Sequence, residues 1–304
     1  MDFPLRLDSE DYASPNRDIS QSIEYAHLRE QDEPLPISMP PAENANCSPD
    51  YLFEPIYRRE DSLYVPAGHK SVIRLGEEAD PMAAPMSSSI DESTQALVHA
   101  LHNGISQIAV IENQINRFIE YRMLQAQQKL VFEINLADID ENPATLVRIA
   151  HLIKRAEADG LRPTDFVVEL SCNVDIDRGI LYTITAELKR MGVMIALTNL
   201  DADSFSFTRV LQIQPDVIKF NRSWCEQDLN DPAYIRMVHG LVAGFHDRGR
   251  FTNLSGIATW EELLFASKCG FTRCQGPFFG KPVAELERGP TYCIRSRRAL
   301  TQAA

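Results

Sequence analysis

Polar residues able to bind ions stand at the ends of the strands that the hydrophobic pattern predicts. Carboxylate and amide oxygens bind hard divalent cations, whereas Lys and Arg side chains bind phosphate groups. In an α/β barrel, functional residues lie at the carboxyl ends of the strands. In chain order, these positions hold Arg74, Asn135, Glu169, Thr198, Asn199, Lys219, Asn221, Ser255 and Gln275. Glu169 is the single carboxylate among them, so these positions supply few anionic ligands for a hard divalent cation.

The elements that must position these residues alternate between strand and helix. Strand patterns occur at 130–136, 166–170, 193–198, 216–220, 250–254 and 271–274, and helical patterns at 108–122, 143–159, 175–191, 203–213, 231–248 and 259–268. Strands separated by single helices imply parallel βαβ units. We therefore predict an α/β fold, a modified (β/α)₈ TIM-type barrel, in preference to an open doubly wound sheet, for which no glycine-rich phosphate loop is present.

Three regions follow from composition. Residues 1–50 contain seven prolines and many acidic residues, so we expect a disordered acidic leader. A second low-order stretch, 76–93, is expected to be a long loop. The barrel should occupy residues 51–288, and residues 289–304 should form a basic, solvated C-terminal tail.

Charge and hydropathy exclude several classes of protein. The formal net charge of −13 disfavours binding to nucleic acid, because the surface would repel a phosphate backbone. The chain has no run of about 18 apolar residues and no signal-peptide pattern at its start, so we expect no membrane span and a cytoplasmic protein.

Six ordered segments together resemble one known family. The family is the EAL domain, whose members hydrolyse cyclic di-GMP with two divalent metals on a modified barrel. The similarity extends from about Tyr51 to Glu285 and implies the same barrel here. The segments are Phe-Glu-Pro-Ile at 53–56, Phe-Glu-Ile-Asn-Leu-Ala at 132–137, Phe-Val-Val-Glu-Leu at 166–170, Gly-Val-Met-Ile-Ala-Leu-Thr-Asn-Leu at 192–200, Pro-Asp-Val-Ile-Lys-Phe-Asn-Arg at 215–222 and Gln-Gly-Pro-Phe-Phe-Gly-Lys-Pro at 275–282.

The departures from the family pattern concern its metal ligands. The signature glutamate falls on Lys70, and the paired aspartates that follow a later strand become Thr198 and Asn199. A further ligand aspartate becomes Asn221, and two glutamates become Ser255 and Ala258. The resemblance thus implies no catalytic residue, no bound metal and no cofactor, because only Glu169 and Asn135 remain as ligands.

Three functions are compatible with this set. The first is a catalytically inactive, EAL-like signalling protein that contacts another protein. The second is a non-hydrolysing receptor for cyclic di-GMP, because two lysines and an arginine around one glutamate leave net positive charge. The third, residual phosphodiesterase activity, would require replacement carboxylates from Asp201 and Asp203. The remnant ligand-binding set is Lys70, Arg74, Asn135, Glu169, Lys219, Asn221, Gln275, Phe279 and Pro282.

One contact follows from position. The signature residue and the end of the Glu169 strand converge on the same metal in active relatives, so their side chains should meet. We therefore predict that Lys70 pairs with Glu169 at the mouth of the barrel and substitutes for the lost cation.

Overall fold

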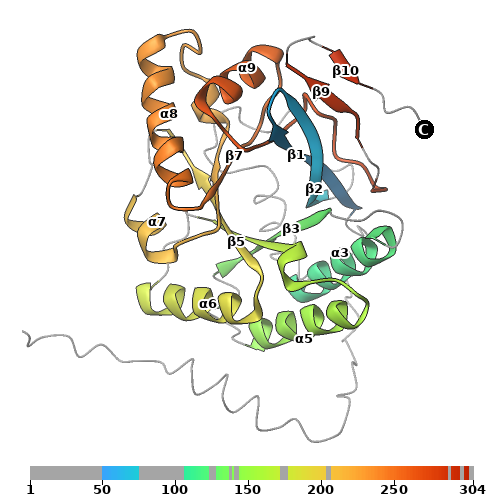
Figure 1. Cartoon of the computed structure of the whole chain (residues 1–304). Helices are drawn as coiled ribbons and strands as arrows, with labels where there is room; N and C mark the ends of the chain where they lie inside the picture. The colour runs from blue at the N-terminus through green and yellow to red at the C-terminus, as the bar shows by residue number, and fades with distance from the viewer. Residues whose placement is uncertain are drawn as a thin grey trace, which may run out of the picture.

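A closed barrel of eight strands forms the centre of the protein, as the sequence predicted (Figure 1). The computed structural model describes residues 50–74, 106–122, 128–136, 139, 144–171, 177–202, 207–286, 289–294 and 298–300. The barrel strands are β1 (Asp50–Glu60), β2 (Leu63–Arg74), β3 (Lys129–Ile134), β4 (Phe166–Ser171), β5 (Met194–Leu200), β6 (Val217–Phe220), β7 (Phe251–Leu254) and β8 (Arg273–Gln275).

The order of the strands explains how the barrel closes. Strands β2 to β8 lie side by side in chain order and run parallel. Strand β1 runs antiparallel both to β2 and to β8, so it is the strand that joins the two edges. The single helices between the strands predicted that β2 to β8 run parallel. The antiparallel strand β1, which closes the barrel, is what distinguishes this fold from the usual (β/α)₈ barrel.

The expected helices are present with small shifts of their ends. They are α3 (Gln107–Arg122), α5 (Ala144–Ala158), α6 (Arg178–Met191), α7 (Phe207–Ile213), α8 (Pro232–His246) and α9 (Trp260–Cys269). Helices α6 and α9 end at Gly192 and Gly270, whose left-handed conformation suits glycine. Helix α9 begins with a capping box between Thr259 and Glu262.

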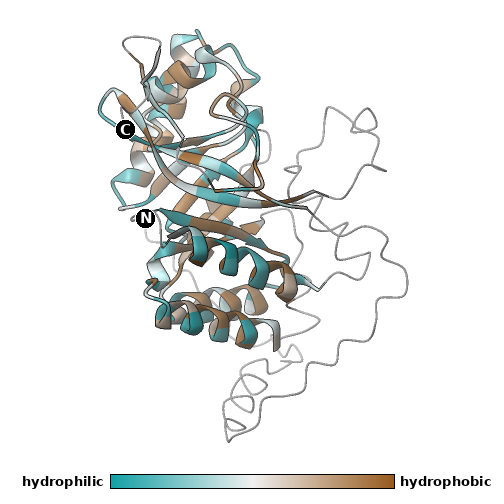
Figure 2. Cartoon of the chain, turned by 90° about the vertical axis from the view of Figure 1, so that its right-hand side faces the viewer, coloured by the Kyte–Doolittle hydropathy of each residue, from teal (hydrophilic) through white to brown (hydrophobic). Residues whose placement is uncertain are grey.

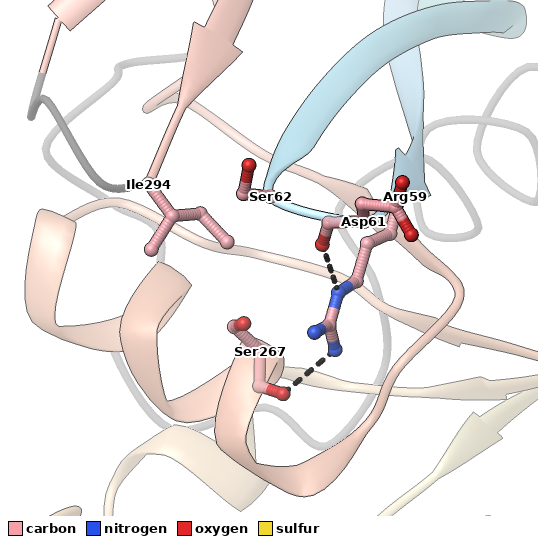
Figure 3. A pocket seen from close by; sticks show the side chains of 5 residues that line it. All are labelled: Arg59, Asp61, Ser62, Ser267 and Ile294. Atoms are coloured by element: carbon pink, nitrogen blue, oxygen red, sulfur yellow. Dashed lines mark hydrogen bonds between the residues drawn. The ribbon is translucent and has the colours of Figure 1, made fainter.

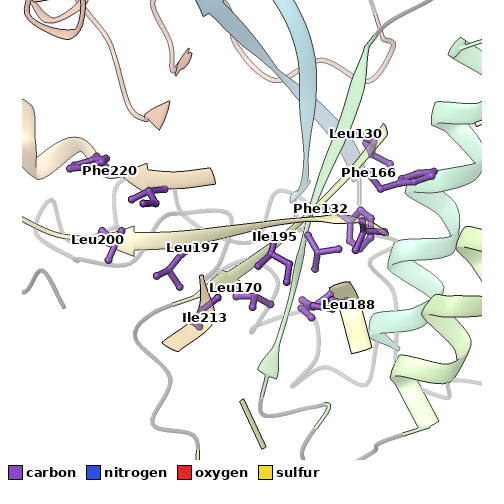
Figure 4. Close-up of a cluster of buried hydrophobic side chains, with 14 of the residues drawn as sticks. Leu130, Phe132, Phe166, Leu170, Leu188, Ile195, Leu197, Leu200, Ile213 and Phe220 are labelled. Atoms are coloured by element: carbon purple, nitrogen blue, oxygen red, sulfur yellow. The ribbon is translucent and has the colours of Figure 1, made fainter. Parts of the chain in front are cut away.

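The main hydrophobic core lies between the barrel and its helices. In α5, the buried residues Leu146, Ile149 and Ile153 recur at helical spacing and therefore form one apolar face. Figure 2 shows hydrophilic and hydrophobic residues together along the helices, as amphipathic packing requires. Figure 4 shows part of the core, including Phe166 of β4 and Leu188 of α6. A smaller apolar cluster fills the barrel interior and consists of Ile56, Val131, Val167, Ala196 and Val217.

The C-terminal segment differs from the expected solvated tail. It contributes β9 (Thr291–Cys293) and β10 (Arg298–Leu300), and β9 pairs antiparallel with Leu63 and Tyr64 of β2. The Tyr292 ring packs edge-on against Tyr57, with ring centroids 5.4 Å apart. Aromatic packing of this kind holds the segment on the sheet despite its basic composition.

Other expectations concern the rest of the chain. The acidic leader, apart from its last residue Asp50 in β1, and the loop at 76–93 lie outside the described residues. Within the described residues, no helix combines the length and apolarity needed to cross a bilayer.

Gly276 positions the end of β8 and provides a test of the fold. Its φ is +140°, and a Cβ there would lie 2.3 Å from the backbone nitrogen of Ile257. We expect Gly276→Ala to lower the free energy of unfolding by about 2 kcal/mol or more, because strain and a backbone clash combine. The control is Gly240→Ala in α8, where nothing lies within 4 Å and a gain of about 0.5–1 kcal/mol is expected. Urea unfolding measures both, and equal stability of the two variants would contradict the packing described.

Candidate functional site

Four buried charged residues gather inside the barrel toward the carboxyl ends of its strands. They are Lys70 of β2, Glu133 of β3, Glu169 of β4 and Lys219 of β6. Side chains alternate between the two faces of a strand, and this alternation directs all four inward. Lys70, Glu169 and Lys219 are each 1% exposed. The barrel has therefore taken charged groups out of water, which is costly unless they are paired.

Glu169 is the centre of the cluster. Lys70 Nζ lies 3.0 Å from Glu169 Oε2, and Lys219 Nζ lies 3.1 Å from Glu169 Oε1. Lys219 Nζ also donates to Oε2 at 3.4 Å. The predicted pair between Lys70 and Glu169 is confirmed, and both carboxylate oxygens are engaged by ammonium groups.

Glu133 is a member of the cluster that the sequence reasoning missed. Its carboxylate Oε2 lies 3.9 Å from Lys70 Nζ, and it stands directly beside Glu169 in the parallel register. Glu133 thus adds a second carboxylate beside the two lysines, where one glutamate was expected. The side chain of Arg74, the third cation of the expected set, lies outside the described residues. The available signal was strand periodicity, because Glu133 precedes Asn135 by two residues and so shares its face.

A second polar chain lies across β1, β7 and β8. Gln275, which is buried, donates to Glu54 Oε2 at 3.0 Å and accepts a hydrogen bond from the Asn253 amide at 3.0 Å. Glu54 is also the partner of Lys70 in the register of β1 and β2. Gln275 thus stands at the end of β8, the strand end expected for it, and its amide is held there by two protein groups.

The Asn221 side chain forms hydrogen bonds that stabilise the local backbone and a neighbouring carboxylate. Its side-chain oxygen caps the short 3-10 helix Arg222–Cys225 by accepting from the Ser223 nitrogen at 3.1 Å. Its amide donates to the carboxylate of Asp201, which is buried. Asp201 was one of the two candidate replacement carboxylates, and here it bonds to Asn221; the other, Asp203, lies outside the described residues.

The remaining predicted residues divide between core, surface and strand ends. Phe279 differs from its expected place in a ligand-binding set, because it is buried and stacks on Tyr57 with centroids 4.4 Å apart. Pro282 is exposed on the following segment, and Asn135 is half-buried beyond the end of β3. Arg74 ends β2, and its side chain lies outside the described residues.

The donor set does not fit the two divalent metals that the family resemblance implies. Lys70, Thr198, Asn221 and Ser255 stand where the resemblance places metal ligands, and none of them carries a carboxylate. The Ser255 hydroxyl donates to the backbone oxygen of Phe220 at 3.0 Å. No group of three or more His, Cys, Asp or Glu residues in the described ranges could hold a metal ion.

A separate cavity of about 360 Å³ lies beside the turn between β1 and β2 (Figure 3). Its lining includes Arg59, Asp61 and Ser267. The Arg59 guanidinium donates to the backbone oxygens of Asp61 at 2.9 Å and Ser267 at 2.8 Å. Arg59 therefore ties the turn to the end of α9, and we assign it a structural role.

The fold and the strand-end residues define an EAL-type α/β barrel, with an antiparallel first strand and a polar interior at the carboxyl ends. The sequence profile of the EAL domain matches residues 89–282, which is more than half of the chain, and the chain belongs to the EAL domain family. The matched segment begins after β2, so Lys70 lies outside it.

Known proteins resemble this chain in sequence and in fold. An uncharacterized EAL-domain containing protein of Bacillus subtilis, YkuI, is 26% identical over 177 residues, covering 57% of this chain and 42% of the relative. The chain therefore spans less than half the length of that relative. The YkuI structure in complex with cyclic di-GMP and calcium matches with a TM-score of 0.59 at 19% identity, covering 79% of this chain and 57% of the other. The Pseudomonas aeruginosa FimX EAL domain bound to cyclic di-GMP matches with a TM-score of 0.58 at 18% identity, covering 89% and 98%. At these identities, the structural matches show the fold.

The ion cluster predicts a large loss of stability when one cation is removed. We expect Lys70→Ala to lower the free energy of unfolding by about 3–5 kcal/mol, because buried carboxylates lose their partner. The control is Arg190→Ala, which breaks the exposed pair with Glu187 and should cost about 1 kcal/mol or less. Urea unfolding of both variants tests this, and a loss at Lys70 no larger than that at Arg190 would sink the assignment.

Proposed function

We propose that this chain is an EAL domain that does not hydrolyse cyclic di-GMP and that acts in cyclic-di-GMP signalling through contacts with another protein. The observation that carries the proposal is the state of Glu169. This carboxylate is the main metal ligand left of the family pattern, and both of its oxygens lie within 3.1 Å of a lysine ammonium.

The chemical argument concerns charge. Two-metal hydrolysis needs several carboxylates that hold two ions close together and lower the pKa of the attacking water. In this cluster, lysine ammonium groups occupy the positions beside the Glu169 carboxylate where a metal ion would bind. A divalent ion would therefore have to displace Lys70 or Lys219 and leave that lysine buried and unpaired. The charge balance among the four residues gives such an exchange no electrostatic benefit.

Exposed apolar residues on the outer helices support a protein contact. Tyr182 of α6 is 72% exposed, and Leu211 and Phe207 of α7 are 57% and 55% exposed. The two helices are joined by a hydrogen bond from Lys189 Nζ to the backbone oxygen of Ile213 at 3.0 Å. A contiguous exposed apolar patch marks an interaction site, and we infer that these three side chains on joined helices belong to one such patch.

A cyclic-di-GMP receptor is the second candidate. It is favoured by the similar FimX and YkuI structures, which were solved with cyclic di-GMP bound, and by the retained residues Gln275 and Asn135. The paired lysines weigh against it, because they are committed to carboxylates and do not offer free charge to a phosphodiester. We therefore place the receptor after the protein-contact role.

Hydrolysis is the first test. Purified protein incubated with cyclic di-GMP and Mg²⁺ or Mn²⁺ should release no linear product, because the anionic ligands needed for two metals are missing. Chromatography of the reaction measures this. Metal-dependent turnover that disappears in Glu169→Ala would refute the proposal, whereas turnover that persists in that variant would indicate a contaminating enzyme.

Binding separates the two candidates. In calorimetric titration with cyclic di-GMP, the wild-type protein should give no saturable heat. Glu169→Gln removes the carboxylate that holds both lysines, so this variant should bind the nucleotide more tightly than the wild type does. Saturable micromolar binding by the wild type would instead establish the receptor function.

A further inference from the structure

The amino-terminal end of the barrel holds a second group of charges, opposite the cluster around Glu169. Three cations, Arg58 of β1, Lys129 of β3 and Arg273 of β8, line a cavity of about 70 Å³. The cavity runs between apolar side chains of the barrel interior, and the paired residues Glu169 and Lys219 lie along its wall. The charges of that pair cancel, which leaves Arg58 and Arg273 as the guanidinium groups of the lining. The Lys129 ammonium is already engaged, because it donates to the backbone oxygen of Thr164 at 2.5 Å.

Arg58 and Arg273 stand directly opposite each other on the neighbouring strands β1 and β8. They are direct partners in the antiparallel register of β1 and β8, and both line the cavity. Like charges directly opposite each other destabilise a sheet. Arg58 has partial compensation at the rim, where its guanidinium lies 2.6 Å from Glu60, with both side chains about half exposed.

Arg273 has no such compensation. Within the described residues it forms no ion pair and donates no hydrogen bond, and its contact is with the Phe251 ring, 4.3 Å from the guanidinium carbon. Burial, followed by the nearby charge of Arg58, lowers the pKa of Arg273 to about 10. Among the described residues, the buried Arg273 guanidinium is thus stabilised by an aromatic ring and by no anion, and a buried cation without an anionic partner is a feature of binding sites.

The size of the cavity limits what can enter. At roughly 10–15 Å³ for each water molecule, a volume of about 70 Å³ accommodates about five heavy atoms. A phosphate group has that number, whereas a nucleotide has several times more. Guanidinium groups match the oxygens of phosphate with paired N–H donors.

We propose that the amino-terminal end of the barrel binds a single phosphate-sized oxyanion between Arg58 and Arg273. Arg58 and Arg273 lie at the opposite end of this cavity from Glu169 and Lys219, and the proposal does not depend on the function proposed for the cluster around Glu169. The bound anion would neutralise the opposed arginines and join β1 to β8, the seam at which the barrel closes.

The test compares the stability of the full chain in inorganic phosphate and in chloride at the same ionic strength. Phosphate should raise the melting temperature of the wild type and of the control Arg236→Gln, which changes an exposed arginine on α8. Arg273→Gln should lose this rise and should bind phosphate at least about tenfold more weakly in calorimetry. In chloride alone, Arg273→Gln should be at least as stable as the wild type, because the opposed pair is relieved.

Two further arms complete the experiment. Arg58→Gln should also lose the response to phosphate, and it serves if Arg273→Gln does not fold. Glycerol phosphate identifies the source of the group: weaker binding than inorganic phosphate indicates a free anion, and equal or tighter binding indicates the phosphate of a small metabolite. An unchanged melting temperature of the wild type in phosphate, or an equal response in Arg273→Gln, would overturn the proposal.

Discussion

A buried, ionised carboxylate is costly unless a positive charge lies beside it, and in this barrel Glu169 is paired with two lysines. The lysines come from opposite directions, since β2 and β6 each lie two strands away from β4 in the sheet. The ion pairs therefore connect strands that share no backbone hydrogen bonds, and they do so across the interior. In a medium of low dielectric constant, such contacts depend strongly on geometry, so the neighbouring groups, including Glu133 and the chain from Glu54 through Gln275, are arranged around them.

Much of the architecture could be predicted from the chain alone. The alternating strand and helix patterns, with Gly192 and Gly270 at two of the helix ends, gave the parallel barrel, because burial of both strand faces leaves continuous apolar runs. The pairing of Lys70 with Glu169 was also predictable, since it follows from position in the family pattern. The first inference rests on periodicity and order along the chain, and the second rests on the resemblance to the EAL family.

The missed features depend on contacts between distant segments. Glu133 stands in an ordinary strand pattern, and its participation becomes visible once β3 and β4 are in register. The placement of β9 on β2 depends on aromatic packing, and the local pattern of the basic C-terminal segment does not predict that packing. The opposition of Arg58 and Arg273 likewise requires the register of β1 and β8, which are far apart in sequence. The two ends of the barrel also differ in charge balance, and that difference is a property of the closed structure.

The closing strand also constrains the order of events during synthesis. Gln275 and its partner Glu54 are separated by 221 residues, so β1 leaves the ribosome long before β8 exists. At about 5–20 residues per second, the delay is roughly 10–45 s. During that interval β1 can pair with β2 in a local hairpin, while its other edge stays open to aggregation. The long hairpin of β1 and β2 therefore covers one edge of β1 during this delay, and the other edge is covered only when β8 joins the barrel.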